Sequence, residues 1–262
     1  ELLSDRSGDK LVAKMDEAGI DKAIILPLDF WLGCPPSEGI SIEEKNAVYA
    51  EAVKSHAGRL MTHVGVDPRR ENALEIMRKG VEEFGAVGLK LHPTAGFYPD
   101  DPVCEPLYRK ALEYDIPVLI HSGNEPAPLR IKFSQPKYID TVAAQFPDLK
   151  IIIAHTGHGW WNEAVDLASV KPNVYVDFAG WQMEYLNGAD YFYQPLRFAI
   201  DTLGPWRVLF GTDGSMLDVL FSPRDWLLAH KEYQSPSGIS FAGEELDIVL
   251  GQAAARLYGL KD

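Results

Sequence analysis

Three of the seven histidines and one aspartate directly follow short apolar runs of the kind that form buried strands. They are His92, His121, His155 and Asp213. In a parallel barrel the strand tips converge on one mouth, so these four side chains are expected to face a common cavity. Imidazole and carboxylate groups suit zinc, with iron or manganese as substitutes. The pattern therefore predicts a site for one divalent ion.

Lys90 stands two residues before His92 and shares its strand face, because side chains alternate along a strand. Both could point into the mouth and bind a substrate carboxylate. Alternatively, Lys90 pairs inside the barrel with an acidic neighbour such as Asp67 or Asp177. The sequence leaves these two readings open.

The remaining histidines give weaker signals. His158 lies three residues beyond His155 and is expected to line a loop. His63 falls within a strand pattern, which favours core packing over catalysis. His56 and His230 fall in helical segments, and we expect both at the solvated surface.

Short apolar stretches that favour strands alternate with helical patterns along the whole chain. A Ser-x-x-Glu capping box at Ser41 and Glu44 opens one of the intervening helices. Strict alternation predicts parallel pairing, since antiparallel neighbours need only a tight turn. The seven candidate strands are Lys22 to Leu28, Leu60 to Val66, Ala86 to Leu91, Pro117 to His121, Lys150 to His155, Val174 to Phe178 and Arg207 to Gly211.

The connections differ in length according to their direction. Those from helix to strand are brief, whereas those leaving the strands, such as 123–136 and 180–190, are long and irregular. This asymmetry favours a (β/α)8 TIM barrel over a doubly wound open sheet, and no Gly-x-Gly-x-x-Gly follows a strand. We expect one domain over 1–262. Because a barrel needs eight strands, we also expect a first strand upstream of Glu1.

Composition restricts the classes of partner. The 262 residues carry a formal net charge of −13, which disfavours binding to nucleic acid and to anionic membrane surfaces. No apolar run approaches the roughly 20 residues that span a bilayer. Cys34 and Cys104 form no disulfide framework, which favours a reducing, cytoplasmic location. The expected partner is a small-molecule substrate.

Taken in order, four segments resemble the amidohydrolase superfamily, in the branch that groups metal-dependent hydrolases with non-oxidative decarboxylases on a distorted (β/α)8 barrel. Each short segment is a weak match alone, but the ordered set runs over nearly all of the chain. The segments are Val-Leu-Ile-His-Ser-Gly at 118–123, Ile-Ile-Ala-His-Thr-Gly at 152–157, Leu-Phe-Gly-Thr-Asp at 209–213 and Ala-Ala-Arg-Leu-Tyr-Gly-Leu at 254–260.

The resemblance implies roles for particular residues. Family members usually bind one divalent ion through a His-x-His pair on the first strand, a His after the fifth and an Asp after the eighth. For this chain we expect the ion to be zinc. The last two roles fall on His121 and Asp213, and His155 is expected to contact the activated water or the substrate. The His-x-His pair has no counterpart in the sequence. Either it lies upstream, or the chain belongs with the minority of relatives that work without metal.

The expected function is a metal-dependent hydrolase of a small, carboxylated amide, ester or lactone, which uses a metal-activated water. Asp213 would take the proton from the water and pass it to the leaving group. The alternative is a non-oxidative decarboxylase of a hydroxy-aromatic or enol acid; such relatives typically carry Pro-His shortly after the aspartate, whereas here 214–217 reads Gly-Ser-Met-Leu. A catalytically silent binding barrel is the alternative from another class, and a homodimer is compatible with the resemblance.

Overall fold

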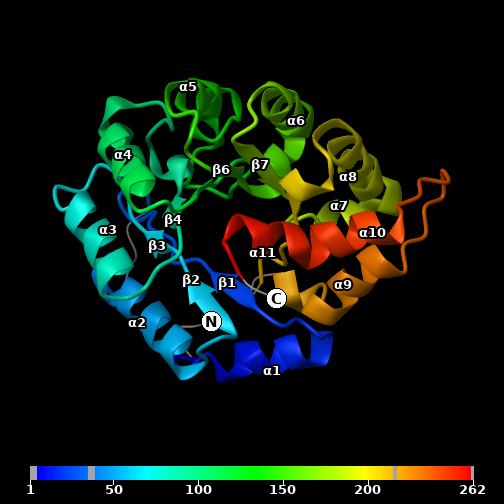
Figure 1. Cartoon of the computed structure of the whole chain (residues 1–262), viewed down its shortest axis with the longest axis horizontal. Coiled ribbons are helices and arrows are strands. Elements are labelled where there is room, and N and C mark those ends of the chain that lie inside the picture. The colour runs from blue at the N-terminus through cyan, green and yellow to red at the C-terminus, as the bar shows by residue number, and fades with distance from the viewer. Residues whose placement is uncertain (1–4, 35–38, 215–216, 261–262) are drawn as a thin grey trace.

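The computed structural model describes residues 5–34, 39–214 and 217–260. Its strands surround a central axis and its helices form an outer ring, which is the arrangement of a TIM barrel (Figure 1). All seven predicted strand segments are present. The strands are β1 (Ala23–Ile25), β2 (Leu60–Thr62), β3 (Val64–Gly65), β4 (Leu89–Leu91), β5 (Val118–Ile120), β6 (Ile151–Ile153), β7 (Val174–Asp177) and β8 (Val208–Leu209).

The strands pair in parallel throughout, as the sequence predicted. They form a two-stranded sheet, β1-β2, and a six-stranded sheet in the order β3-β4-β5-β6-β7-β8. The predicted strand Leu60 to Val66 is divided at His63, where β2 ends and β3 begins. The Thr62 hydroxyl donates to the carbonyl oxygens of Ile25 and His63, at 3.1 and 2.8 Å. A side chain that bonds nearby backbone carbonyl groups in this way competes with regular pairing.

Helices cover the strands on the outside. The predicted capping box is present at the start of α2, where the Ser41 side chain accepts from the Glu44 amide and the Glu44 carboxylate accepts from the Ser41 amide. The helices are α1 (Asp9–Ala18), α2 (Ile42–Ser55), α3 (Ala73–Glu82), α4 (Glu105–Glu113), α5 (Lys137–Gln145), α6 (Trp161–Val170), α7 (Gln182–Asn187), α8 (Ala189–Leu203), α9 (Pro223–Lys231), α10 (Gly243–Asp247) and α11 (Ala253–Leu257).

The segment 180–190, expected to be irregular, instead contains α7. Tertiary contacts fix this short helix. The Trp181 indole donates to the His155 carbonyl oxygen at 2.8 Å, and the Gln182 side chain donates to the Thr212 carbonyl oxygen at 2.6 Å. These contacts tie the connection after β7 to the connections after β6 and β8.

Apolar side chains form two packed layers. Outward-facing residues such as Val118 and Ile151 join the helices in the main core. Inward-facing Leu119, Ile152 and Leu209 form a smaller cluster inside the barrel, with Leu257 of α11. Side chains alternate between the two faces of a strand. A residue just past the strand end therefore points into the mouth when it lies two positions after an inner-face residue. The inner face therefore delivers His92 and His121 to that mouth.

Two helices from opposite ends of the chain, α1 and α9, lie side by side. α1 packs against α9, and the Lys14 ammonium contacts the Asp218 carboxylate at 2.7 Å. Within the described ranges, none of the helices is long and apolar enough to cross a membrane.

Candidate active site

Four imidazoles lie in a row at the mouth of the barrel. The ring centroids of His92 and His121 are 4.3 Å apart, those of His121 and His155 are 5.0 Å apart, and those of His155 and His158 are 5.1 Å apart. His92, His121 and His155 are all buried. The structure thus brings together the three strand-tip histidines that the sequence selected, and adds His158, which the sequence analysis had assigned to a loop.

The first part of the row contains a carboxylate that sequence reasoning missed. Glu125 Oε1 lies 3.3 Å from His92 Nε2 and 3.6 Å from His121 Nε2. Suitable ligand atoms of these three residues all lie within 4.8 Å of one another. Glu125 follows His121 by four positions in the long connection after β5, and that spacing was the available signal. Whether Glu125 lies near His121 depends on how this connection folds, which the spacing alone does not determine.

The second part of the row converges on Gly180. A Cβ built on this glycine would lie 3.1 Å from His155 Nδ1, 3.3 Å from Asp213 Oδ2 and 3.4 Å from His158 Nε2. Asp213 therefore lies beside His155, as the sequence predicted. Among the described residues, Asp213 does not join His121 in a group of three potential ligands within 4.8 Å.

The backbone of this second part is strained. His155, Thr156 and His158 have φ values of 58°, 48° and 44°, and Asp213 has a φ of 48°. Left-handed conformations cost roughly 1–2 kcal/mol per residue in non-glycine residues. Such strain persists only where the surrounding structure holds it, and it concentrates at functional sites.

Asp177, at the end of β7, holds the strained turn in place. Its carboxylate accepts from the backbone amides of His155 and Ala179, at 2.8 and 3.1 Å. The Thr156 hydroxyl donates to the Asp177 carbonyl oxygen at 2.6 Å. His155 Nδ1 lies 2.8 Å from the Ala179 carbonyl oxygen. That oxygen only accepts, so Nδ1 carries a proton and donates it in this contact.

Lys90 is buried on the inner face of β4 and lines the cavity. Burial lowers the pKa of its ammonium group to about 8, while the carboxylates of Asp177, Asp213 and Glu125 act in the opposite direction. Of the two acidic neighbours expected for Lys90, Asp67 instead pairs with Arg69, at 2.5 Å. Asp177 remains the electrostatic partner within the barrel.

Burial keeps the imidazoles of His92, His121 and His158 neutral near pH 7. It lowers the pKa of His121 well below the usual range, and the adjacent His92 and His155 lower it further. Burial likewise lowers the pKa of His92, and that of His158 to about 4. Neutral imidazole is the form that binds metals. His121 Nε2 is buried and has no hydrogen-bond partner among the described residues, so the residues present fit a divalent ion.

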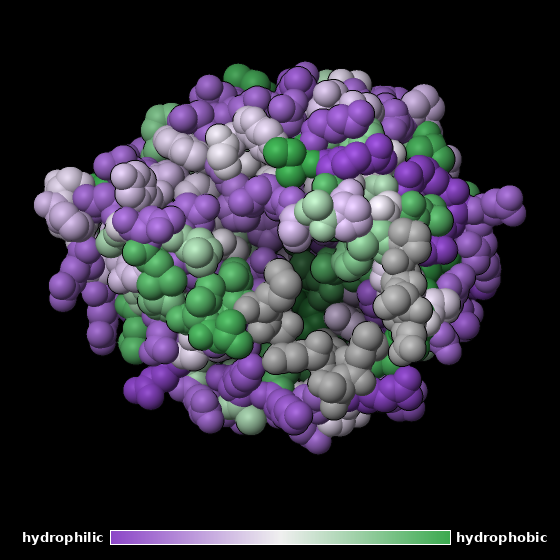
Figure 2. All heavy atoms as spheres, turned by 180° about the vertical axis from the view of Figure 1, so that it is seen from behind, coloured by the Kyte–Doolittle hydropathy of each residue, from purple (hydrophilic) through white to green (hydrophobic). Residues whose placement is uncertain are grey.

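A cavity of about 2040 Å³ opens onto these groups. Its lining includes the imidazoles of the row, Asp213, and the inner-face residues Leu119 and Ile152 below them. Figure 2 shows a hollow near the centre of one face of the molecule, with apolar residues at its depth. A small organic molecule can therefore reach the polar groups at the strand tips.

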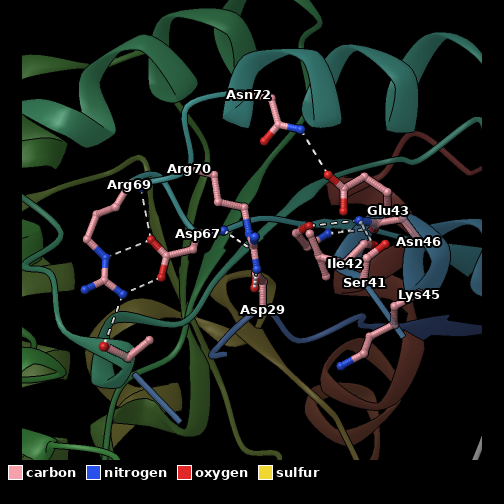
Figure 3. Close-up of polar contacts among 12 residues, drawn as sticks. Asp29, Ser41, Ile42, Glu43, Lys45, Asn46, Asp67, Arg69, Arg70 and Asn72 are labelled. Carbon is pink, nitrogen blue, oxygen red and sulfur yellow. Dashed lines mark hydrogen bonds and ion pairs between the residues drawn. The ribbon is translucent and has the colours of Figure 1, made fainter. Parts of the chain in front are cut away.

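The loops around the mouth are joined by ion pairs between partly exposed arginines and buried carboxylates (Figure 3). The Arg70 guanidinium donates to both carboxylate oxygens of Asp29, at 2.6 and 2.8 Å. Arg69 binds Asp67 and also donates to the Ala95 carbonyl oxygen, at 3.1 Å. Since Ala95 closes the short 3-10 helix Pro93–Ala95 directly after His92, this network supports the segment that follows β4.

The sequence model of an amidohydrolase family matches residues 38–260. The chain belongs to this amidohydrolase family. The match spans the strand-tip residues described above.

The chain is similar to three further proteins. It is 26% identical over 125 residues to protein fluG of Emericella nidulans, an alignment that covers 48% of this chain and 14% of that protein. A TIM-barrel protein of Bordetella bronchiseptica, described as uncharacterised, is 24% identical with a TM-score of 0.75, covering 99% of this chain and 85% of that one. A dihydroxybenzoic acid decarboxylase of Polaromonas sp. JS666, solved with manganese and 2-nitroresorcinol, is 20% identical with a TM-score of 0.67, covering 96% and 86%.

Proposed function

We propose that this amidohydrolase-family chain is a metal-dependent hydrolase of a small, carboxylated amide, ester or lactone. The observation that carries the proposal is the convergence of His155, His158 and Asp213 on Gly180, next to the pair His92 and His121. Zinc is the expected ion, with iron or manganese as substitutes. His121 is the expected ligand after the fifth barrel strand, and Asp213 is proposed as a ligand and as the proton carrier.

A bound divalent ion would polarise the substrate carbonyl and lower the pKa of a water molecule toward 7. Asp213 then accepts the proton of the attacking water and returns it to the leaving group. Because His155 Nδ1 donates to the Ala179 carbonyl oxygen, Nε2 is the ring nitrogen that remains to contact that water and orient it. Lys90 and His92 would bind the carboxylate of the substrate, since Lys90 is a buried cation in the same cavity.

The test is turnover by the metal-loaded full chain. Carboxylated amides, esters and lactones are assayed for acid release, alongside matched analogues that lack the carboxylate. We expect activity toward the carboxylated members, and Asp213→Asn should lower kcat by roughly 10²- to 10⁴-fold, the usual contribution of a general acid or base. Absence of turnover with zinc, iron and manganese alike would contradict the proposal and favour a binding barrel.

The second candidate is non-oxidative decarboxylation of a hydroxy-aromatic or enol acid, with Asp213 protonating the carbon that loses carbon dioxide. Its support is the similarity in fold to the manganese-containing decarboxylase described above. The same samples, incubated with aromatic hydroxy acids, are assayed for bicarbonate. Bicarbonate release without any ester, amide or lactone hydrolysis would replace the first candidate by the second.

A further inference from the structure

We propose that Lys45 is a substrate-binding residue and that, together with Lys90, it selects a substrate that carries two carboxylates. The inference rests on the proposed function, because it extends the carboxylate recognition that this function assigns to Lys90 and His92. It adds a second anion-binding group on the side of the cavity formed by α2 and the connection after β1.

Two lysines in the described ranges have buried side chains, and both line the same cavity. They are Lys45 of α2, which is 8% exposed, and Lys90 of β4, which is 3% exposed. Lysine is almost never fully buried unless its charge is paired. The ion pairs that lysines form in this part of the chain involve neither of the two. Two such cations in one cavity suit a ligand with two anionic groups.

The carboxylate that acts on Lys45 is held by other groups. Burial lowers the pKa of Lys45, and the Asp29 carboxylate acts in the opposite direction. Both oxygens of Asp29 accept from Arg70, at 2.6 and 2.8 Å, and one of them also accepts from the Asp67 amide at 2.7 Å (Figure 3). Asp29 therefore attracts the Lys45 ammonium without forming an ion pair with it.

The Lys45 ammonium has only part of its hydrogen-bonding capacity filled. Its nitrogen donates to the Leu28 carbonyl oxygen at 2.9 Å. The same nitrogen lies 4.2 Å from the centroid of the Trp31 ring and 5.6 Å from that of the Phe30 ring. An ammonium group has three N–H donors. Since the Leu28 oxygen is its hydrogen-bond acceptor within the described ranges, donors remain for a carboxylate of a ligand.

The Phe30 ring connects this ammonium to the polar groups at the strand tips. Phe30 lines the cavity, and its ring centroid lies 5.5 Å from that of His92. One aromatic ring therefore contacts both the Lys45 ammonium and the His92 imidazole. A small substrate can thus place one carboxylate at Lys90 and His92 and the other at Lys45, with its carbon skeleton against Phe30.

The experiment compares ligands that differ by one carboxylate. The metal-loaded full chain is titrated by calorimetry near pH 7 with succinate, adipate and suberate, in which the two carboxylates are increasingly far apart. Butyrate, hexanoate and octanoate are the monocarboxylates of the same chain lengths. We expect at least one dicarboxylate to bind roughly 10- to 100-fold more tightly than its monocarboxylate, the range expected of a hydrogen bond to a charged group. Equal or weaker binding of every dicarboxylate would overturn the inference, because a second carboxylate against an apolar wall is costly to bury.

Variants of Lys45 test whether this residue is the source of the preference. Lys45→Met keeps the aliphatic part of the side chain and removes its charge, and Lys45→Gln keeps a donor for the Leu28 carbonyl oxygen. Both should abolish the preference for the dicarboxylate and leave the affinity for the monocarboxylate unchanged. Lys231→Met is the matched control, because Lys231 is an exposed lysine that lines the same cavity, and it should keep the preference. Equal losses of affinity for both classes of ligand in the Lys45 variants would show that Lys45 only anchors the connection after β1, and would overturn the inference.

The outcomes separate this inference from the proposed function. Affinity is measured without turnover, so a dicarboxylate preference that depends on Lys45 supports the inference even if no ester, amide or lactone is hydrolysed. If the chain instead hydrolyses matched mono- and dicarboxylated esters with the same kcat/KM, the inference is wrong and the proposed function stands.

Discussion

At the scale of single residues, the site depends on a glycine as much as on its acids and bases. Gly180 has a φ of 83°, and a Cβ at this position would lie within 3.4 Å of three polar atoms of the site. The sequence analysis selected His155 and Asp213 because residue type and position at a strand tip are local properties. Glu125 escaped it, since its position is set by a loop that folds back over the mouth.

Gly180→Ala tests how closely this part of the site is packed. The methyl group would enter at 3.1–3.4 Å from His155, His158 and Asp213, and the left-handed backbone adds strain. We expect a loss of roughly 1–2 kcal/mol of stability from the backbone and a large fall in kcat, measured by urea unfolding and by steady-state assay. Gly251→Ala is the control, because its Cβ would meet nothing within 4 Å. Equal activity in the two variants would contradict the close packing.

A histidine away from the site shows the limit of residue-level reasoning. His230 was expected at the surface, and this was wrong: it is buried, with its ring against Phe192, Phe210 and Trp226. The helical pattern of α9 was identified correctly. Which face of α9 meets the aromatic side chains of α8 could not be read from the pattern, because that contact joins segments distant in sequence.

At the scale of elements, strands were easier to predict than connections. The apolar runs and brief helix-to-strand turns identify both ends of β5 and β6 within two residues, and those of β4 within three. The division of β2 from β3 and the helix α7 depend on hydrogen bonds to other elements, such as Trp181 to the His155 carbonyl oxygen. Local periodicity contains no information about such contacts.

The ion pairs among the loops give an element-scale prediction. Asp67 is fully buried, so Arg69→Ala would leave an unpaired buried carboxylate, which costs roughly 3–5 kcal/mol. It would also release the 3-10 helix after His92, and metal affinity should fall. Arg78→Ala is the control, because its pairs with Glu75 and Glu82 are exposed and such pairs contribute about 0–1 kcal/mol. Urea unfolding of both variants checks this, and equal losses would contradict it.

At the scale of the whole molecule, the barrel explains why residues far apart in sequence can share a site. Parallel strands in sequential order bring the tips of β4, β5, β6 and β8 to one rim. That much followed from the alternation of strands and helices. The division of the row into one part with Glu125 and another part around Gly180 could not be predicted, because it depends on loop conformations that the strand pattern does not determine.

The most direct test of the account is the anomalous diffraction of a zinc-soaked crystal, recorded on both sides of the zinc absorption edge. We expect a single strong peak at the mouth of the barrel, about 2.1 Å from His121 Nε2 and beside Asp213 and His155. A zinc-loaded crystal with no peak in contact with His121, or with a peak only at the outer surface, would contradict the claim that these strand-tip residues form one metal-dependent active site.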